Sequence, residues 1–146
     1  MDNYALFQEY LQLDHQIEEF YHTLAQSQGL SDSAHWVLWS LAELGEGCTQ
    51  ADICRQFFIS KQTVHSSVRK LEQDGLLSLC PKEGREVALF LTDRGREAVR
   101  EKIRPAMEAE RAAAQGLTAE EWEAILRLSR KWLSLFREAA APLLKT

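Results

Sequence analysis

The chain has 146 residues, of which 45% are hydrophobic and 27% charged, as expected for one globular domain with or without helical extensions. There is no window of about 18 apolar residues, and the acidic start lacks the basic and apolar regions of a secretory signal, so we expect no membrane span and a cytoplasmic location. The three cysteines have no CxxC spacing, which excludes a zinc knuckle.

The net charge of −5 is unevenly distributed. Residues 1–54 carry nine acids and no Lys or Arg, residues 55–100 carry nine Lys/Arg against six acids, and residues 101–146 carry eight against seven. A binding partner responds to the local field and not to the total charge. The basic middle segment is therefore compatible with nucleic acid.

Four helices are predicted in the first half. Apolar residues recur at helical spacing from Tyr4 to Leu24, and Gly29 follows as a stop signal. Ser31 or Asp32 is expected to cap a helix over 34–44, which "GEG" ends. Thr49 and Asp52 predict a capped helix to Phe57. Ser60 predicts the start of a fourth helix, which runs to Glu72 or Gln73 and is followed by Gly75.

The second half begins with two strand-like runs, 76–80 and 86–91, on either side of "PKEGR". Thr92 then starts another helical pattern, in which Pro105 predicts a kink or break. Thr118 and Glu121 form a capping box for a last helix with an apolar stripe. Two helices joined by a short turn and followed by a hairpin predict a winged helix-turn-helix, so the fold class is mainly α with a small β-hairpin wing.

The fourth helix has two different faces. Val64, Val68 and Leu71 fall on one face and are expected to pack on Leu38, Ile53 and Phe57. The opposite face carries Gln62, His65, Ser66 and Arg69, and no acid occurs from Ser60 to Lys70. Many polar helix faces only contact water, but here the turn, the hairpin and the basic balance together favour DNA binding.

The predicted DNA contacts comprise the start and outer face of this helix and the hairpin tip. Gln62 and His65 are expected to read bases, and Lys61, Arg69 and Lys70 to bind phosphates. The full set is Ser60, Lys61, Gln62, Thr63, His65, Ser66, Arg69, Lys70 and Arg85.

Two segments, "TQADICRQFFISKQTVHSSVRKLEQDGLL" and "EGREVALFLTDRG", resemble the multiple antibiotic resistance regulator (MarR) family of bacterial winged-helix transcription factors. The first is similar to the family's capped helix, turn, recognition helix and closing Leu-x-x-x-Gly-Leu. In the second, Arg85, Leu91, Thr92 and Gly95 match the wing signature, whereas Glu83 stands where Asp is usual.

The resemblance implies a homodimeric repressor that binds a pseudo-palindromic operator in double-stranded DNA. Residues 1–30 and 101–146 would form dimerisation helices around a DNA-binding domain at 31–100. Apolar residues on the terminal helices agree with this, because a small core cannot cover them all.

The resemblance also implies release from DNA by a small aromatic or phenolic effector. Aromatic walls with polar tips suit such a pocket, and the candidate residues are His15, Tyr21, His35, Trp36 and Trp39. The alternative is that Trp36 and Trp39 belong to the core.

Other functions have weaker signals. Cys48, Cys54 and Cys80 leave a thiol-oxidation-responsive regulator open, and a winged helix that binds proteins is a further alternative. The scattered histidines predict no metal site, and no cofactor motif is present. No nucleophile elbow or phosphate loop occurs, so we expect no enzymatic activity.

Overall fold

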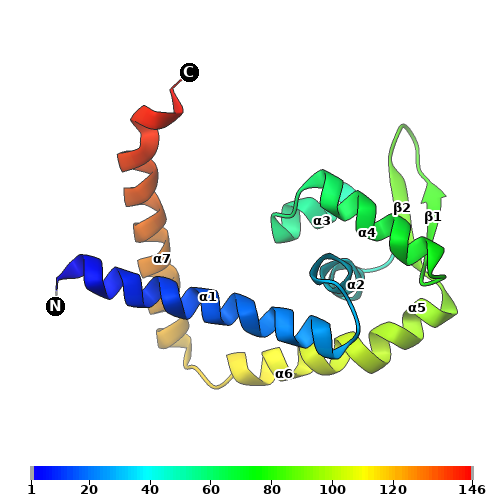
Figure 1. Ribbon diagram of the computed structural model, residues 1–146, viewed down its shortest axis with the longest axis horizontal. Helices are drawn as coiled ribbons and strands as arrows, with labels where there is room; N and C mark the ends of the chain where they lie inside the picture. Colours follow the sequence, from blue (N-terminus) through cyan, green and yellow to red (C-terminus); the bar gives the residue numbers. More distant parts are fainter. Residues whose placement is uncertain (1, 146) are drawn as a thin grey trace. The chain divides into compact units, whose positions relative to one another are not determined.

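The computed structural model describes residues 2–145 and is mainly helical (Figure 1). It divides into two compact units, one up to Met107 and one from Glu108 onward. The elements in chain order are α1 (Asn3–Ser27), α2 (Asp32–Leu44), α3 (Gln50–Phe57), α4 (Lys61–Gln73), β1 (Leu77–Pro81), β2 (Val87–Leu91), α5 (Asp93–Ala98), a π-helical turn (Val99–Ile103), α6 (Arg104–Ala114), α7 (Ala119–Ala140) and a 3₁₀ turn (Ala141–Leu144). No helix in the described part of the chain is long and apolar enough to span a bilayer.

The helix starts follow from side-chain caps, and the predicted caps are confirmed. In each case a Ser or Thr oxygen accepts a hydrogen bond from a backbone N–H of the first turn, which would otherwise lack a partner. Thr49 with Asp52 and Thr118 with Glu121 form complete capping boxes. The predicted capping residues are Ser31, Thr49, Ser60, Thr92 and Thr118, and the Asp2 carboxylate caps α1.

Helix α2 is the centre of the first unit and contacts α1, α3, α4, β2 and the π-helical turn (Figure 1). Its Leu38 is fully buried in one apolar cluster with Ile53 of α3 and Val64 and Val68 of α4. Leu71 joins the same cluster, and Phe57 packs against it. The predicted inward face of α4 is therefore confirmed.

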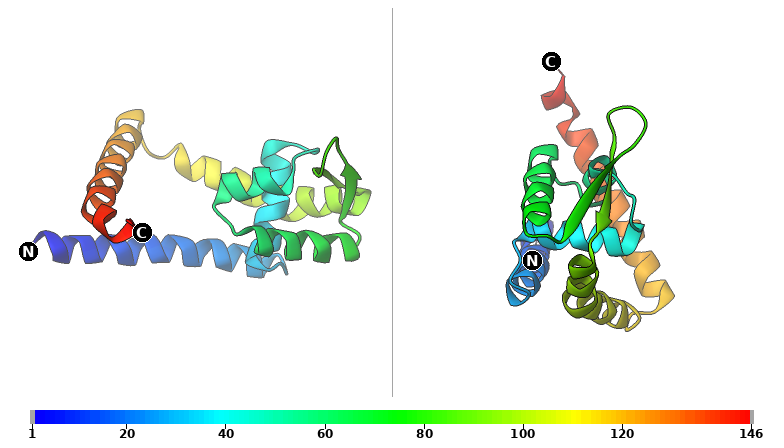
Figure 2. Two further views of the ribbon diagram at one scale, coloured as in Figure 1. Left: turned by 90° about the horizontal axis from the view of Figure 1, so that it is seen from above. Right: turned by 90° about the vertical axis from the view of Figure 1, so that its right-hand side faces the viewer.

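The two strands form an antiparallel hairpin whose register pairs Leu77 with Leu91 and Pro81 with Val87. The loop before α3 adds a short third segment, since Leu89 N–H donates to the Cys48 carbonyl at 2.8 Å and Gly47 N–H donates to the Leu89 carbonyl at 2.7 Å. The hairpin tip extends away from the helices of its unit (Figure 2). The wing base is thus attached to the start of the helix-turn-helix.

Of the kink or break predicted at Pro105, a break does not occur, and the helix is instead distorted just before the proline. The chain runs from α5 through a π-helical turn into α6, with Pro105 as the second residue of α6. In this turn Arg104 N–H donates to the Val99 carbonyl, five residues back. Because proline has no N–H to donate, the distortion takes the form of a widened turn just before it.

The second unit consists of the end of α6 and α7. No residue of α7 is buried, and Trp132 and Phe136 stack with ring centroids 5.5 Å apart. In the first unit, α1 likewise exposes large apolar side chains, among them Tyr10, Leu13, Ile17 and Phe20. The functional division at residues 30 and 100 stays a prediction.

Candidate nucleic-acid interface

The outer face of α4 is polar and open to solvent. Gln62, His65, Ser66 and Arg69 are all exposed, whereas Val64, Ser67 and Val68 are buried on the opposite side. Ser67 bonds to Ser33 at the start of α2 and so belongs to the packing of α4. The face that amphipathic spacing predicted to point outward is the face that is free to enter a groove.

The start of α4 is organised by Ser60 and Thr63. The Ser60 hydroxyl accepts from Thr63 N–H at 3.2 Å and donates to the Thr63 hydroxyl at 2.7 Å. These bonds set the first turn, which leaves the positive end of the helix dipole beside exposed Lys61. A helix start of this kind attracts phosphate, while the two hydroxyls are partly occupied by capping.

The cations of α4 differ in their surroundings. Lys70 Nζ lies 3.1 Å from Asp74 Oδ1, and this exposed pair costs little to separate. Arg69 makes no ion pair within residues 2–145, and neither does Lys61. One guanidinium group, of Arg69, and one ammonium group, of Lys61, are therefore exposed on α4 without a bonded acid in the described chain.

The wing presents Arg85 at its tip. Gly84 has φ +79°, a conformation that suits glycine, and Lys82 N–H donates to the Glu86 carbonyl at 2.9 Å to close the loop. Arg85 is exposed and has no ion-pair partner in the described chain, so Glu83 does not hold it.

Glu46, which the sequence reasoning missed, anchors the base of the wing. Its Oε1 accepts the backbone N–H of Leu91 at 2.9 Å and a guanidinium N–H of Arg96 at 3.1 Å. The Arg96 hydrogen bonds and the Leu91 amide lower the pKa of the Glu46 carboxyl. Its place in a "GEG" turn was the only local signal, because the contacts join residues about 45 to 50 positions apart.

The predicted effector residues fall into three environments. His15 is exposed on α1, with Nδ1 3.8 Å from Glu18. His35 and Trp39 are buried in the core, which matches the alternative stated for Trp39. Tyr21 and Trp36 are half-buried, and their ring centroids lie 5.1 Å apart.

Tyr21 and Trp36 line a cavity of about 350 Å³. Phe57, at the end of α3, supplies a further wall and stacks on Trp36 at 5.0 Å. Polar groups come from α1 and the first turn of α2, and the complete lining is Glu18, Tyr21, His22, Asp32, Trp36 and Phe57. Of the five predicted effector residues the structure brings two into this cavity.

His22 and Asp32 form the main polar contact of this cavity, with Nδ1 and Oδ1 2.7 Å apart. The hydrogen bond and charge of Asp32 raise the pKa of His22. Glu18, Tyr21 and His22 have helical i, i+3, i+4 spacing, so the α1 wall was readable from the sequence. The sequence did not indicate that Asp32 and Phe57 also line the cavity.

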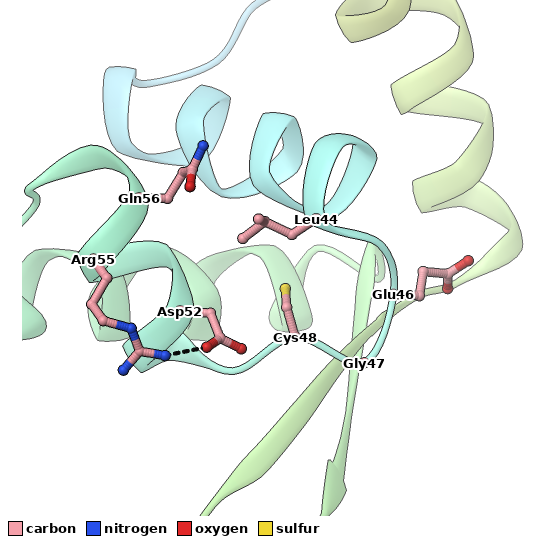
Figure 3. Close-up of a pocket in the computed structure, with 7 residues that line it drawn as sticks. All are labelled: Leu44, Glu46, Gly47, Cys48, Asp52, Arg55 and Gln56. Carbon is pink, nitrogen blue, oxygen red and sulfur yellow. Dashed lines mark hydrogen bonds and ion pairs between the residues drawn. The ribbon is translucent and has the colours of Figure 1, made fainter.

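A second hollow of about 520 Å³ lies beside the start of α3 (Figure 3). Its lining includes Cys48 and the ion pair of Arg55 with Asp52. Burial raises the pKa of the Cys48 thiol, which lowers the fraction of reactive thiolate. Cys54 is half-buried and Cys80 is exposed.

Solved structures of other proteins share this fold. NMB1585, a MarR family regulator from Neisseria meningitidis, aligns with a TM-score of 0.76 over 97% of this chain and 99% of its own at 21% identity. MepR in the S. aureus MepR–DNA complex aligns with a TM-score of 0.64 over 93% of this chain and 98% of its own, at 22% identity. BpsR of Bordetella bronchiseptica, whose DNA binding is regulated by 6-hydroxynicotinic acid, aligns with a TM-score of 0.63 over 85% of this chain and 98% of its own, at 25% identity.

A search of curated protein sequences gives no match. The MarR family model matches residues 28–86, which run from the end of α1 to the hairpin tip and include the complete helix-turn-helix. The structural neighbours extend the same fold over the terminal helices. Residues 28–86 of this chain thus match the model of the MarR family, and the chain as a whole has the fold of MarR family regulators.

Proposed function

We propose that this regulator is a homodimeric repressor that leaves its operator when a small aromatic effector binds. The main support for this proposal is that Phe57 lines the aromatic cavity and is also the last residue of α3, immediately before the turn that leads into α4. A ligand against Phe57 and Trp36 would act on the angle between α3 and the recognition helix. The regulation of BpsR by 6-hydroxynicotinic acid is a precedent in a protein of the same fold.

The proposed DNA surface consists of the outer face of α4 and the wing tip. Gln62 and His65 read bases from the major groove, and Arg85 reaches the adjacent minor groove. Lys61, Arg69 and Lys70 bind phosphates and supply most of the salt-dependent affinity. Ser60, Thr63 and Ser66 complete the contact surface, the first two while also capping α4.

The proposed dimer uses the terminal helices. Helices α1 and α7 expose more large apolar side chains than a monomer keeps in water, and a second copy would cover them. A two-fold dimer would present two copies of α4 and would therefore bind a pseudo-palindromic operator. Such a repressor would act in the cytoplasm, where bacterial DNA lies.

Regulation by thiol oxidation has less support. The most buried thiol, Cys48, has a raised pKa, and the exposed Cys80 Sγ lies 3.8 Å from the Pro81 carbonyl oxygen. Aromatic effector binding has a cavity beside the helix-turn-helix, so it is the favoured trigger.

Selection of bound fragments from a random DNA pool tests the proposal. We expect enrichment of a pseudo-palindrome with half-sites about 10 base pairs apart, and a light-scattering mass of a dimer on that DNA. Fluorescence anisotropy with the selected site, with and without aromatic compounds, then tests release. A selected site without two-fold symmetry would contradict the dimeric repressor.

A further inference from the structure

The cavity at Trp36 has an unusual balance of charge. Its lining holds the carboxylates of Glu18 and Asp32 and one histidine, His22, and includes no Lys or Arg. The surrounding chain strengthens this imbalance, because residues 1–54 contain nine acids and no Lys or Arg. An anionic ligand would meet repulsion from the walls and from the field around them.

The apolar walls favour a cation as well. The Trp36 ring lies 5.1 Å from Tyr21 and 5.0 Å from Phe57, so three aromatic groups meet at the cavity. The faces of aromatic rings carry negative partial charge, and clusters of them bind ammonium groups, most strongly when the ammonium is desolvated. Carboxylates beside such rings add a direct Coulomb attraction.

The nearby histidines do not give the cavity lining a net positive charge. His22 is bonded to Asp32 at 2.7 Å, and His15 lies 3.8 Å from Glu18 on the solvent side of α1. A neutral His22 leaves two carboxylates in the lining, and a protonated His22 offsets only one of them. Arg55, the nearest cation along the chain, is paired with Asp52 and lines the other hollow.

We propose that the Tyr21–Trp36–Phe57 cavity selects a cationic aromatic ligand, an aryl amine or quaternary ammonium, over phenolates and aromatic carboxylates. The effect of such a ligand on DNA rests on the proposed function, whereas its selective binding does not. The ammonium lies between Glu18 and the aromatic rings, and the aryl group fills the rest of the 350 Å³ cavity.

Three probes of similar size separate the charge classes: benzyltrimethylammonium, neutral benzyl alcohol and anionic salicylate. Their affinities for the full chain are measured by isothermal titration calorimetry at about pH 8.5, about two pH units above the ordinary imidazole pKa, to reduce protonation of His22. We expect the cation to bind at least about tenfold more tightly than either other probe, as a desolvated cation–π contact with carboxylates allows.

The double variant Glu18→Gln, Asp32→Asn removes both lining charges with little change of shape. We expect it to weaken binding of the cation about tenfold and to leave benzyl alcohol unchanged. Glu9→Gln is the matched control, since Glu9 lies on the same helix, about 13 Å from Glu18 along its axis and beyond the Debye length of about 8 Å. The control is expected to bind all three probes like the native chain.

The outcomes separate this inference from the proposed function. Salicylate that binds more tightly than the cation and releases DNA would overturn the charge selectivity and support the aromatic-effector repressor. Cation binding that depends on Glu18 and Asp32 but leaves DNA affinity unchanged would support the selectivity and overturn the effector role. No binding of the cation up to about 10 mM, weaker than any specific site, would overturn the inference.

Discussion

Glu46 and Arg96 join the loop after α2 to the helix behind the wing, with Oε1 and Nη2 3.1 Å apart. The same Glu46 oxygen accepts the amide of Leu91, the last residue of β2. Arg96 also pairs with Asp93 at 3.1 Å. The direction of the wing therefore depends on one carboxylate that contacts both a strand end and a helix start.

Replacing Glu46 by Gln should loosen this junction. We expect the free energy of unfolding at neutral pH to fall by about 0.5–1 kcal/mol, because the Gln oxygen can still accept from the Leu91 amide but lacks the charge that strengthens this bond and the pair with Arg96. The pKa of Glu46 is lowered from 4.5 in the native state, so its contribution is present above about pH 4.5 and disappears as the pH falls through the native pKa. Urea titrations at about pH 7 and pH 3.5 check this.

Glu43→Gln removes a nearby exposed carboxylate of α2 and serves as the control. An equal loss of stability in both variants would show that Glu46 has no special structural role.

Replacing Gly95 by Ala should damage the junction of α4, β1 and α5. A Cβ built at Gly95 would lie 2.0 Å from the Leu76 carbonyl oxygen, and backbone cannot move aside cheaply. We expect the free energy of unfolding to fall by about 3 kcal/mol, measured by urea denaturation. Glu97→Ala, on the exposed side of the same helix, should change it little.

Acid should destabilise the native state through His35. Its Nδ1 lies 2.7 Å from Gln28 Oε1, while its buried Nε2 has no partner among the described residues. Because Gln28 Nε2 donates to the Lys102 carbonyl, Gln28 Oε1 faces His35 and the proton of the neutral ring is on Nδ1. A second proton on Nε2 would create a buried charge without an acceptor.

Burial therefore lowers the pKa of His35, although the charge of Asp32 partly opposes this shift. Between the native pKa and about 6.5 the unfolded chain binds one proton more, so stability falls as the pH drops below about 6.5, by at most about 1.4 kcal/mol per pH unit. His35→Asn keeps a donor for Gln28 and should lose less stability than the native chain between about pH 7.5 and 5.5. Equal losses in both proteins would rule out His35 as the cause.

Arg85→Ala should weaken operator binding through the wing. We expect the free energy of operator binding to weaken by about 1–3 kcal/mol. The slope of log affinity against log salt concentration should fall by about one released counterion. Anisotropy titrations at several salt concentrations measure both quantities. Arg111→Ala removes the same charge from α6 and should leave both unchanged, while an unaltered salt slope for Arg85→Ala would exclude a phosphate contact.

Leu133→Arg should weaken the proposed dimer. Leu133 lies on the exposed apolar stripe of α7, and a buried unpaired charge at an interface is costly. We expect the dimer dissociation constant to rise at least about tenfold, measured by sedimentation equilibrium. Ser134→Arg adds the same charge about 100° around the helix, away from the stripe, and is expected to have a smaller effect.

Short-range patterns were sufficient for most of the helix boundaries. Ser60 and Gly75 bracket α4 because a cap needs only one side chain and the adjacent turn, and helical spacing alone predicted its buried face. The family assignment rested on the same local motifs.

Long-range relationships were beyond such patterns. The sequence showed aromatic and histidine residues on α1 and α2, yet it could not show that His35 and Trp39 turn into the core while Trp36 remains half-buried. It placed a proline in a helix but not the π-helical turn that accommodates it. Both results depend on which neighbours the helix packs against.

The sequence by itself determined the order of elements, the winged helix-turn-helix and the polar outer face of α4, because periodicity and capping act within a few residues. Only the tertiary structure decided that Glu46 anchors the wing and that Glu18, Asp32 and Phe57 meet at Trp36. These groups come from separate elements, and their proximity follows from the packing of α1, α2 and α3 around one core. The sign of charge in the cavity at Trp36 is a property of that packing.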